Sequence, residues 1–181
     1  MVTMADVTSQ RRLEEQLRSA ALHDGLTGLP NRTLLRDRLG HALAAARRDA
    51  ATVAVLYCDL DGFKSVNDTH GHAVGDEVLV ETARRLSAAL RPGDTVARIG
   101  GDEFVLLCTD VAAPSVAEII TARVCAAMAE PVITSAGVHR VGISVGVALS
   151  DPASTPDSMS IAADAAMYRV KAGRRRSLAP R

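Results

Sequence analysis

Two acidic residues follow a pair of glycines in the segment 98–104, which reads Arg-Ile-Gly-Gly-Asp-Glu-Phe. Apolar residues flank this segment on both sides, and the pattern predicts two strands joined by a tight turn. The turn would present the carboxylates of Asp102 and Glu103 beside glycines that let another molecule approach the backbone closely. Such a turn suits a metal-bound phosphate better than an apolar ligand. Taken alone, the same residues are also typical of an ordinary solvated hairpin turn.

A third acidic residue, Asp59, ends an apolar run. Residues 51–59 read Ala-Thr-Val-Ala-Val-Leu-Tyr-Cys-Asp, which predicts a buried strand. If this strand lies beside the predicted hairpin, Asp59, Asp102 and Glu103 meet at one end of a sheet. Clustered carboxylates repel one another unless a divalent cation neutralises them. Because Mg²⁺ favours one or two carboxylates together with substrate phosphates, we expect Mg²⁺ here, with Mn²⁺ as the alternative ion.

Three basic residues are candidates for binding phosphate near this metal site. Lys64 begins the helix predicted after Asp59, and Lys171 and Arg175 lie one turn apart at the end of the last predicted helix. Cationic groups beside a metal–carboxylate site fit a triphosphate. The basic run 174–176, taken alone, is equally typical of a solvated helix end.

Asn67 and Asp76 could recognise a base. They lie on the two helices predicted after the first strand. A carboxylate can accept hydrogen bonds from N1–H and N2–H of guanine, and an amide can pair with its N3 and N2. In isolation, each residue is also a common helix-cap or turn residue.

Composition argues against several classes of protein. With 48% hydrophobic residues over 181 positions, the chain should fold around its own core rather than remain disordered. Its 21 basic and 21 acidic residues balance, which argues against a general nucleic-acid binder. We find no apolar run long enough to span a bilayer and no signal-peptide core. The three cysteines lie in apolar segments without metal-ligand spacing, which indicates reduced thiols and a cytoplasmic location.

The remaining patterns predict an α/β fold. The principal helices are expected over 32–48, 74–90, 115–129 and 158–171, with a short one after Asp59. Strands are expected over 51–59, on both sides of the Gly-Gly turn, and over 132–133 and 137–149. This order predicts a mixed or antiparallel sheet covered by helices.

A leader helix is predicted over residues 6–23. Its apolar stripe is narrow, as in a short coiled-coil seam. We expect a dimer-forming or signal-transmitting linker, because the stripe would otherwise have nothing to bury against. The alternative is a solvated leader helix.

Several motifs together resemble the GGDEF family of diguanylate cyclases. In order along the chain they are Asp24–Arg32, Asp59–Lys64, Asn67 with His70-Gly71-His72, Gly75-Asp76, Arg98–Phe104, Ser144-Val-Gly146, and Ala163–Tyr168 before Lys171. The resemblance implies a palm-like fold similar to nucleotide cyclases and polymerases, with a central sheet of about five strands. It implies three parts: a linker over 1–23, a catalytic domain over 24–176 and a tail over 177–181.

The resemblance also assigns roles. Asp59 and Glu103 would hold Mg²⁺ with the Leu60 carbonyl, and Asp102 would bind a second metal ion or help to deprotonate the attacking hydroxyl. The GTP-binding residues implied by the family are Phe63, Lys64, Asn67, Asp76, Gly100, Gly101, Lys171 and Arg175.

Members of this family condense two GTP molecules into cyclic di-GMP and two pyrophosphates across a homodimer. The linker segment 5–8, Ala-Asp-Val-Thr, resembles the end of a PAS domain, so a sensory domain in a longer parent protein is expected. The alternative is a catalytically silent module that binds GTP or cyclic di-GMP and signals by binding.

Arg91 and Asp94 match the family's Arg-x-x-Asp inhibitory site for cyclic di-GMP, although Arg-Pro-Gly-Asp is also an ordinary turn. One departure from the family concerns the end of the domain. The usual Lys-x-x-Gly-Arg-Asn is here Lys171-Ala-Gly-Arg-Arg-Arg, so Arg174 could take the phosphate-binding role in place of Arg175.

Overall fold

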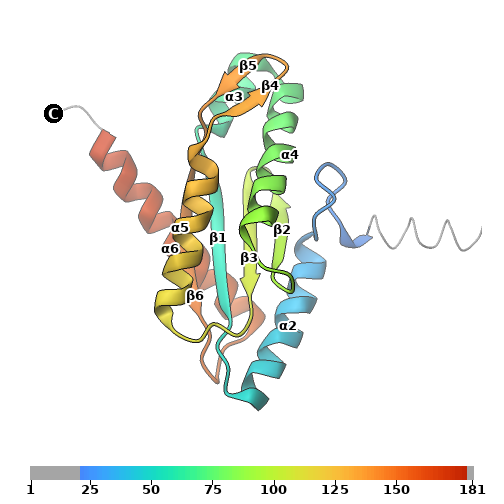
Figure 1. Cartoon of the computed structure of the whole chain (residues 1–181), viewed down its shortest axis with the longest axis vertical. Helices are drawn as coiled ribbons and strands as arrows, with labels where there is room; N and C mark the ends of the chain where they lie inside the picture. Colours follow the sequence, from blue (N-terminus) through green and yellow to red (C-terminus); the bar gives the residue numbers. More distant parts are fainter. Residues whose placement is uncertain (1–20, 179–181) are drawn as a thin grey trace, which may run out of the picture.

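A four-stranded antiparallel sheet forms the centre of the molecule (Figure 1). The computed structural model describes residues 21–178, with side chains described up to 174. The sheet has the order β2-β3-β1-β6. Its strands are β1 (Ala54–Asp61), β2 (Thr95–Gly100), β3 (Glu103–Cys108) and β6 (Gly142–Leu149). The predicted leader helix over 6–23 lies almost entirely outside the described residues.

The predicted α/β fold with an antiparallel sheet is confirmed, but its strand count differs from the expected five or so. The segments β4 (Val132–Thr134) and β5 (Gly137–His139) pair with each other and with no strand of the central sheet. This hairpin lies at one end of the molecule, where the Glu77 carboxylate accepts hydrogen bonds from the Ser135 N–H and hydroxyl. Its three-residue strands are too short to extend along the central sheet.

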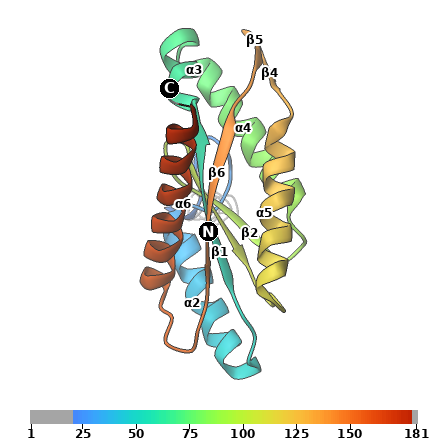
Figure 2. The same cartoon turned by 90° about the vertical axis from the view of Figure 1, so that its left-hand side faces the viewer.

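Helices cover both faces of the sheet (Figure 2). One face packs against α2 (Arg32–Asp49) and α6 (Pro156–Leu178), and the other against α4 (His72–Ala89) and α5 (Pro114–Ala129). The short helix α3 (Phe63–His70) follows β1 and packs against α4. Pro114 begins α5 at the position where a missing N–H costs nothing, and Asn31 caps α2 by accepting from the N–H groups of Thr33 and Leu34.

The alternation of side chains along β1 divides the core in two. Ala54, Leu56, Cys58 and Leu60 face α4 and α5, whereas Val55 and Tyr57 face α2 and α6. By the same alternation, Asp59 and Asp61 point to the α2 and α6 side, where α6 supplies basic partners for both. The period of two therefore decides which helix meets the acidic end of this strand.

Gly146 allows α6 to lie very close to β6. A Cβ atom at this position would come within 1.9 Å of the Met167 nitrogen and 2.4 Å of the Ala163 carbonyl oxygen. Since both are backbone atoms, no side-chain movement could make room for it. The close approach brings the C-terminal half of α6 beside the acidic ends of β1 and β3.

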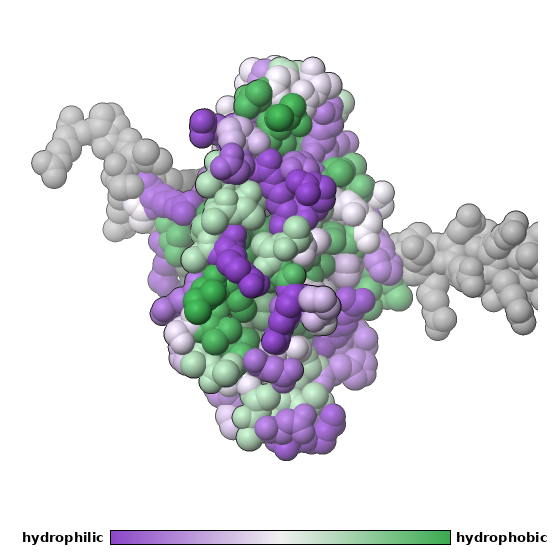
Figure 3. Space-filling view, in the orientation of Figure 1, coloured by the Kyte–Doolittle hydropathy of each residue, from purple (hydrophilic) through white to green (hydrophobic). Residues whose placement is uncertain are grey.

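Apolar and polar side chains are interspersed over the face drawn in Figure 3. Apolar atoms are visible at the end that carries the β4–β5 hairpin, where the cross-strand partners Ile133 and Val138 are exposed. Among the described residues, no helix combines the length and the apolar character needed to cross a bilayer. The three cysteines are free thiols.

Candidate active site

Asp59 and Glu103 lie directly opposite each other on neighbouring strands, and we call them the facing pair. They are direct partners in the antiparallel pairing of β1 with β3, and both lie on the sheet face covered by α2 and α6. Asp102 belongs to the turn between β2 and β3, and its carbonyl accepts a hydrogen bond of 3.3 Å from the Leu60 N–H. The expected meeting of three acidic residues at one end of the sheet is thus present, with Asp59 and Glu103 as its centre.

The acidic groups disfavour one another's ionisation. Burial, and then the charge of Asp59, raises the pKa of Glu103 above its ordinary value. The same two causes in the same order raise the pKa of Asp102. Because the ionised forms are electrostatically costly, bound positive charge would be strongly favoured here.

Tyr57 adds a hydroxyl group to this cluster. Its hydroxyl donates a hydrogen bond to Glu103 Oε2 with an oxygen–oxygen distance of 3.4 Å. Burial raises the pKa of Tyr57 to about 12, with further contributions from the charges of Glu103 and Asp164. The hydroxyl therefore stays protonated at neutral pH and acts as the donor.

Two basic side chains of α6 contact the acidic end of β1. Lys171 Nζ donates to Asp59 Oδ1 at 2.5 Å, and Arg174 donates to Asp61 Oδ2 at 2.7 Å. Arg174 also donates to the Ile143 carbonyl at 2.8 Å, and the Ser144 hydroxyl donates to Asp61 Oδ1. The side chain of Arg175 lies outside the described residues, so its predicted phosphate contact stays a prediction.

A pocket of about 440 Å³ opens at this point. It is lined by Asp59, Glu103, Asp164, Met167, Tyr168, Lys171 and Ala172. Within the described range, no three acidic, histidine or cysteine side chains converge closely enough to hold a metal ion by themselves. Two facing carboxylates, with further oxygen ligands from the backbone and from substrate phosphates, are the donor set that Mg²⁺ prefers. The residues present therefore fit a substrate-bridged Mg²⁺ ion.

Asn67 and Asp76 lie on the adjoining helices α3 and α4. The Oδ1 atom of Asn67 is buried and has no hydrogen-bond partner in the described part of the chain. The side chain packs over Gly75, where a Cβ atom would lie 1.9 Å from that oxygen, and Asp76 is exposed one residue further on. The exposed Asp76 carboxylate is open to an external group, whereas the Asn67 amide must turn away from Gly75 before it can pair with one.

The other predicted nucleotide-binding residues lie near the facing pair or near Asn67 and Asp76. Phe63 is buried at the start of α3, and Lys64 is exposed beside it. Gly100 ends β2, and Gly101 belongs to the turn that precedes the facing pair. The structure therefore places these residues along the end of the sheet that carries Asp59 and Glu103.

Sequence reasoning missed the contact that anchors this turn. Arg98 donates to both carboxylate oxygens of Asp24, at 3.0 and 3.1 Å, and its Nε and Nη2 both donate to the Gly101 carbonyl. Burial raises the pKa of Asp24, but hydrogen bonds from Thr27 and then from Arg98 outweigh it, and the net pKa is lowered. The loop that enters the domain is thus tied directly to the Gly-Gly turn.

Sequence reasoning also gave no role to Tyr57 and Asp164, which lie at the site. Tyr57 precedes Asp59 by two residues, so the strand period alone would have placed it on the same face. Asp164 lies within the family motif 163–168, but the position of its side chain at the site depends on how closely α6 approaches the sheet.

Arg91 and Asp94 lie at the opposite end of β2 from the Gly-Gly turn. The six residues of β2 separate them from that turn by about 20 Å, at about 3.3 Å per residue. Arg91 Nε lies 3.4 Å from Asp94 Oδ1, and Arg91 also donates to the Thr109 carbonyl. The Asp94 side chain is only 1% exposed, so its carboxylate must turn outward to meet a ligand.

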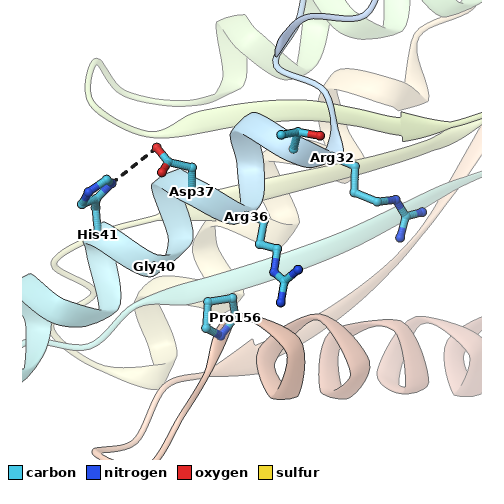
Figure 4. Close-up of a pocket in the computed structure, with 7 residues that line it drawn as sticks. Arg32, Arg36, Asp37, Gly40, His41 and Pro156 are labelled. Atoms are coloured by element: carbon cyan, nitrogen blue, oxygen red, sulfur yellow. Dashed lines mark ion pairs between the residues drawn. The ribbon is translucent and has the colours of Figure 1, made fainter. Parts of the chain in front are cut away.

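A larger groove on α2 is remote from this chemistry (Figure 4). It encloses about 570 Å³ between Arg32, Arg36, Asp37 and the start of α6 at Pro156. Arg36 is directed toward α6 and pairs with Asp157, and Asp37 pairs with His41. This groove contains neither Asp59 nor Glu103, so volume alone does not locate the site.

Comparisons with known proteins agree with this arrangement. The family profile described as "Diguanylate cyclase, GGDEF domain" matches residues 21–177. MucR from Pseudomonas aeruginosa, a bifunctional diguanylate cyclase/cyclic di-GMP phosphodiesterase, is 46% identical over 165 residues, which are 91% of this chain and 24% of MucR. Across the first three curated relatives, the chain spans 21% to 38% of their length.

Two solved structures share the fold. The GGDEF domain of TpbB from Pseudomonas aeruginosa matches with a TM-score of 0.81 at 42% identity, over 83% of this chain and 89% of that one. The coiled coil and GGDEF domain of DgcB from Caulobacter crescentus, solved in complex with c-di-GMP, matches with a TM-score of 0.85 at 31% identity, over 93% and 90%. With the profile covering most of its length, the chain belongs to the GGDEF family of diguanylate cyclases.

Proposed function

We propose that this chain is a diguanylate cyclase in which two copies, each holding one GTP with Mg²⁺, form cyclic di-GMP and two pyrophosphates. The observation that carries the proposal is the facing pair of Asp59 and Glu103 at the end of β1 and β3, with Lys171 against it. At this face and strand end, a metal-bound triphosphate would meet both carboxylates and basic groups.

Asp59 and Glu103 would bind Mg²⁺, with the Leu60 carbonyl as a further ligand. When bound, the ion would polarise the α-phosphate and lower the pKa of the attacking hydroxyl. Asp102, whose pKa is raised by burial and by Asp59, would bind a second ion or receive the hydroxyl proton.

Basic residues would bind the triphosphate and stabilise the charge that develops on pyrophosphate. Lys64 is exposed at the start of α3, where the helix N-terminus also favours phosphate. Lys171 already contacts Asp59, so its ammonium group would lie within reach of a phosphate bound beside Asp59 and Glu103. Arg175 would bind the far end of the triphosphate, with Arg174 as the alternative.

Asn67 and Asp76 would select guanine. The Asn67 amide, once turned away from Gly75, would pair with N3 and N2, and the Asp76 carboxylate would accept from N1–H and N2–H. Because adenine offers neither donor at these positions, the chain should prefer GTP. Phe63 would lie against the nucleotide, and Gly100 and Gly101 would leave room for it.

The reaction requires a second copy of the chain. Each 3′-oxygen forms a bond to the α-phosphorus of the other nucleotide, the α–β phosphoanhydride breaks, pyrophosphate leaves and the hydroxyl proton is released. Two such steps close the cyclic product. A pocket of about 440 Å³ is of a size for one nucleotide, and two such pockets would face each other across a two-fold axis.

Arg91 and Asp94 would bind cyclic di-GMP and restrain the reaction. Their position at the far end of β2 separates such feedback from competition for the active site. We further propose that residues 24–176 form the catalytic domain, that 1–23 form the linker from a sensory domain in a longer cytoplasmic parent protein, and that 177–181 form a tail.

A turnover assay tests the proposal. The chain, at several concentrations, is given GTP and Mg²⁺, and cyclic di-GMP and pyrophosphate are separated by chromatography. A specific rate that rises with chain concentration and is abolished in Glu103→Gln supports the cyclase. Glu118→Gln, an exposed substitution on α5, is the matched control and should behave as the parent does.

The alternative, a silent binding module, predicts a different result. The chain would then bind GTP or cyclic di-GMP, seen as a rise in melting temperature, but would release no pyrophosphate at any chain concentration. That outcome would show that the chain acts as a receptor and not as a cyclase.

A further inference from the structure

We propose that Tyr57 is a positioning residue whose hydroxyl holds the Glu103 carboxylate in its metal-binding orientation. The proposal rests on the proposed function, because it assumes that Glu103 binds the metal ion that accompanies GTP. It starts from the hydrogen bond of 3.4 Å between the Tyr57 hydroxyl and Glu103 Oε2.

Strand register explains why Tyr57 reaches Glu103. Asp59 is the direct partner of Glu103, and Tyr57 is the direct partner of Val105. Tyr57 is therefore the diagonal neighbour of Glu103 on the same face, a separation that only a long or aromatic side chain can bridge. On the other side, Tyr57 faces Gly146 of β6, which has no side chain to compete for the space.

The ring of Tyr57 is held in place by packing. The residue is only 8% exposed and belongs to the apolar cluster between the sheet and α2 and α6. Leu35 and Leu39 of α2, and Met167 of α6, belong to the same cluster. A ring fixed in this way presents its hydroxyl at a defined point, so little conformational entropy is lost when the hydrogen bond forms.

Glu103 requires such a donor because its other neighbours repel it. Asp59, Asp102 and Asp164 all lie close enough to act electrostatically on its carboxylate. Among the described residues, Tyr57 supplies the hydrogen bond that Glu103 accepts. The oxygen–oxygen distance of 3.4 Å exceeds the roughly 2.5–3.0 Å of an ordinary O–H···O bond, and hydrogen bonds of active sites are often long before the ligand binds and tighten in the complex.

The test removes the hydroxyl and keeps the ring. Mn²⁺ affinity is measured by electron paramagnetic resonance in the full chain with the α,β-methylene analogue of GTP, which cannot react. Outer-shell partners of metal ligands typically contribute about 10–100-fold to affinity. We therefore expect Tyr57→Phe to weaken Mn²⁺ binding by about tenfold and to leave the melting temperature nearly unchanged.

The chain supplies a matched control. Its only other tyrosine, Tyr168, lines the pocket that contains Glu103 but is 69% exposed. Tyr168→Phe should leave Mn²⁺ affinity unchanged. In the turnover assay, Tyr57→Phe should raise the Mg²⁺ concentration for half-maximal rate by the same factor as the Mn²⁺ dissociation constant, and saturating Mg²⁺ should restore the rate.

A double substitution tests whether Tyr57 acts through Glu103. In the Glu103→Gln background, Tyr57→Phe should cause no further loss of Mn²⁺ affinity. Parental affinity in Tyr57→Phe, a further loss in the double variant, or a loss matched by Tyr168→Phe would each overturn the proposal while leaving the cyclase intact. If the parent chain binds Mn²⁺ and the analogue but never turns GTP over, the proposed cyclase activity is wrong. The role of Tyr57 is then decided by the Mn²⁺ binding measurements alone.

Discussion

Arg98 connects two parts of the chain that lie far apart in the sequence. Its guanidinium binds the carboxylate of Asp24, 74 residues earlier, and the carbonyl of Gly101 in the turn between β2 and β3. Both partners are only partly exposed, so the interaction is screened less than a surface ion pair. A single side chain therefore sets the position of the turn relative to the loop through which the chain enters the domain.

Substituting Asp24→Asn should destabilise the domain and slow turnover together. The change removes the charge that Arg98 binds, and charge-assisted hydrogen bonds of this kind contribute roughly 1–3 kcal/mol to the free energy of unfolding. Urea unfolding at neutral pH measures the loss. Asp37→Asn is the control, because its exposed pair with His41 should contribute little.

The difference in free energy of unfolding between the parent and Asp24→Asn should depend on pH in a defined direction. The pKa of Asp24 is lowered in the folded state, so its contribution is complete above the unfolded value of 3.8 and disappears as the pH falls through the lower folded value. The free energies of unfolding of the parent and of Asp24→Asn should thus differ by a constant amount above about pH 5 and converge in acid. A difference that persists at the lowest pH would show that the charge is not its origin.

Arg91→Ala should weaken the binding of cyclic di-GMP by tenfold or more, measured by isothermal titration calorimetry. The guanidinium is 53% exposed and can turn from Asp94 and the Thr109 carbonyl toward a ligand at small cost. Arg84→Ala, on the exposed side of α4, removes a similar charge and should leave the affinity unchanged. Progress curves that flatten equally in the parent and in Arg91→Ala would contradict feedback through this residue.

At the scale of secondary-structure elements, the packing of α3 on α4 determines where Asn67 lies. Substituting Gly75→Ala would place a Cβ atom 1.9 Å from Asn67 Oδ1 and 3.3 Å from Phe63 Cζ, so the Asn67 amide has to move and the Phe63 ring has to shift slightly. The helix itself gains about 1 kcal/mol from replacing glycine by alanine. We therefore expect a nearly unchanged free energy of unfolding and a GTP affinity lowered by about tenfold, as for the loss of one specific hydrogen bond.

Gly40→Ala is the matched control for this prediction. It also replaces a helical glycine, on α2, and its new Cβ atom would lie 3.9 Å from Pro156, an ordinary contact. It should gain the same helix stability without any change in GTP affinity. Equal affinities in Gly75→Ala and Gly40→Ala would show that Asn67 does not determine base binding.

The same scale shows what the sequence could predict and what it could not. The apolar run before Asp59 and the Gly-Gly turn predicted β1, β2 and β3, because strand alternation and turn residues are local signals. The separate pairing of β4 with β5 and the bond between Arg98 and Asp24 depend on contacts between distant segments. The close approach at Gly146 likewise appears only once α6 is packed on β6.

At the scale of the whole molecule, the proposed reaction gives each chain only half of the reaction centre. The facing carboxylates, the basic end of α6 and the unpaired Asn67 oxygen describe a site for one nucleotide. The product requires two nucleotides related by two-fold symmetry, so each must come from its own chain. An inactive chain that still dimerises should then pair with active chains and prevent them from completing the reaction.

Mixing experiments test this requirement at saturating GTP and at chain concentrations well above the dimer dissociation constant. With a ninefold excess of Glu103→Gln, only about a tenth of the parent chains have an active partner if pairing is random and two-fold symmetric, so the rate per parent chain should fall about tenfold. A ninefold excess of Glu118→Gln should instead leave the rate per active chain unchanged. If a ninefold excess of Glu103→Gln left the rate per parent chain unchanged, the requirement for a second active chain would be wrong. Inhibition that follows the mole fraction of inactive chains would therefore locate the second half of the reaction centre in a second copy.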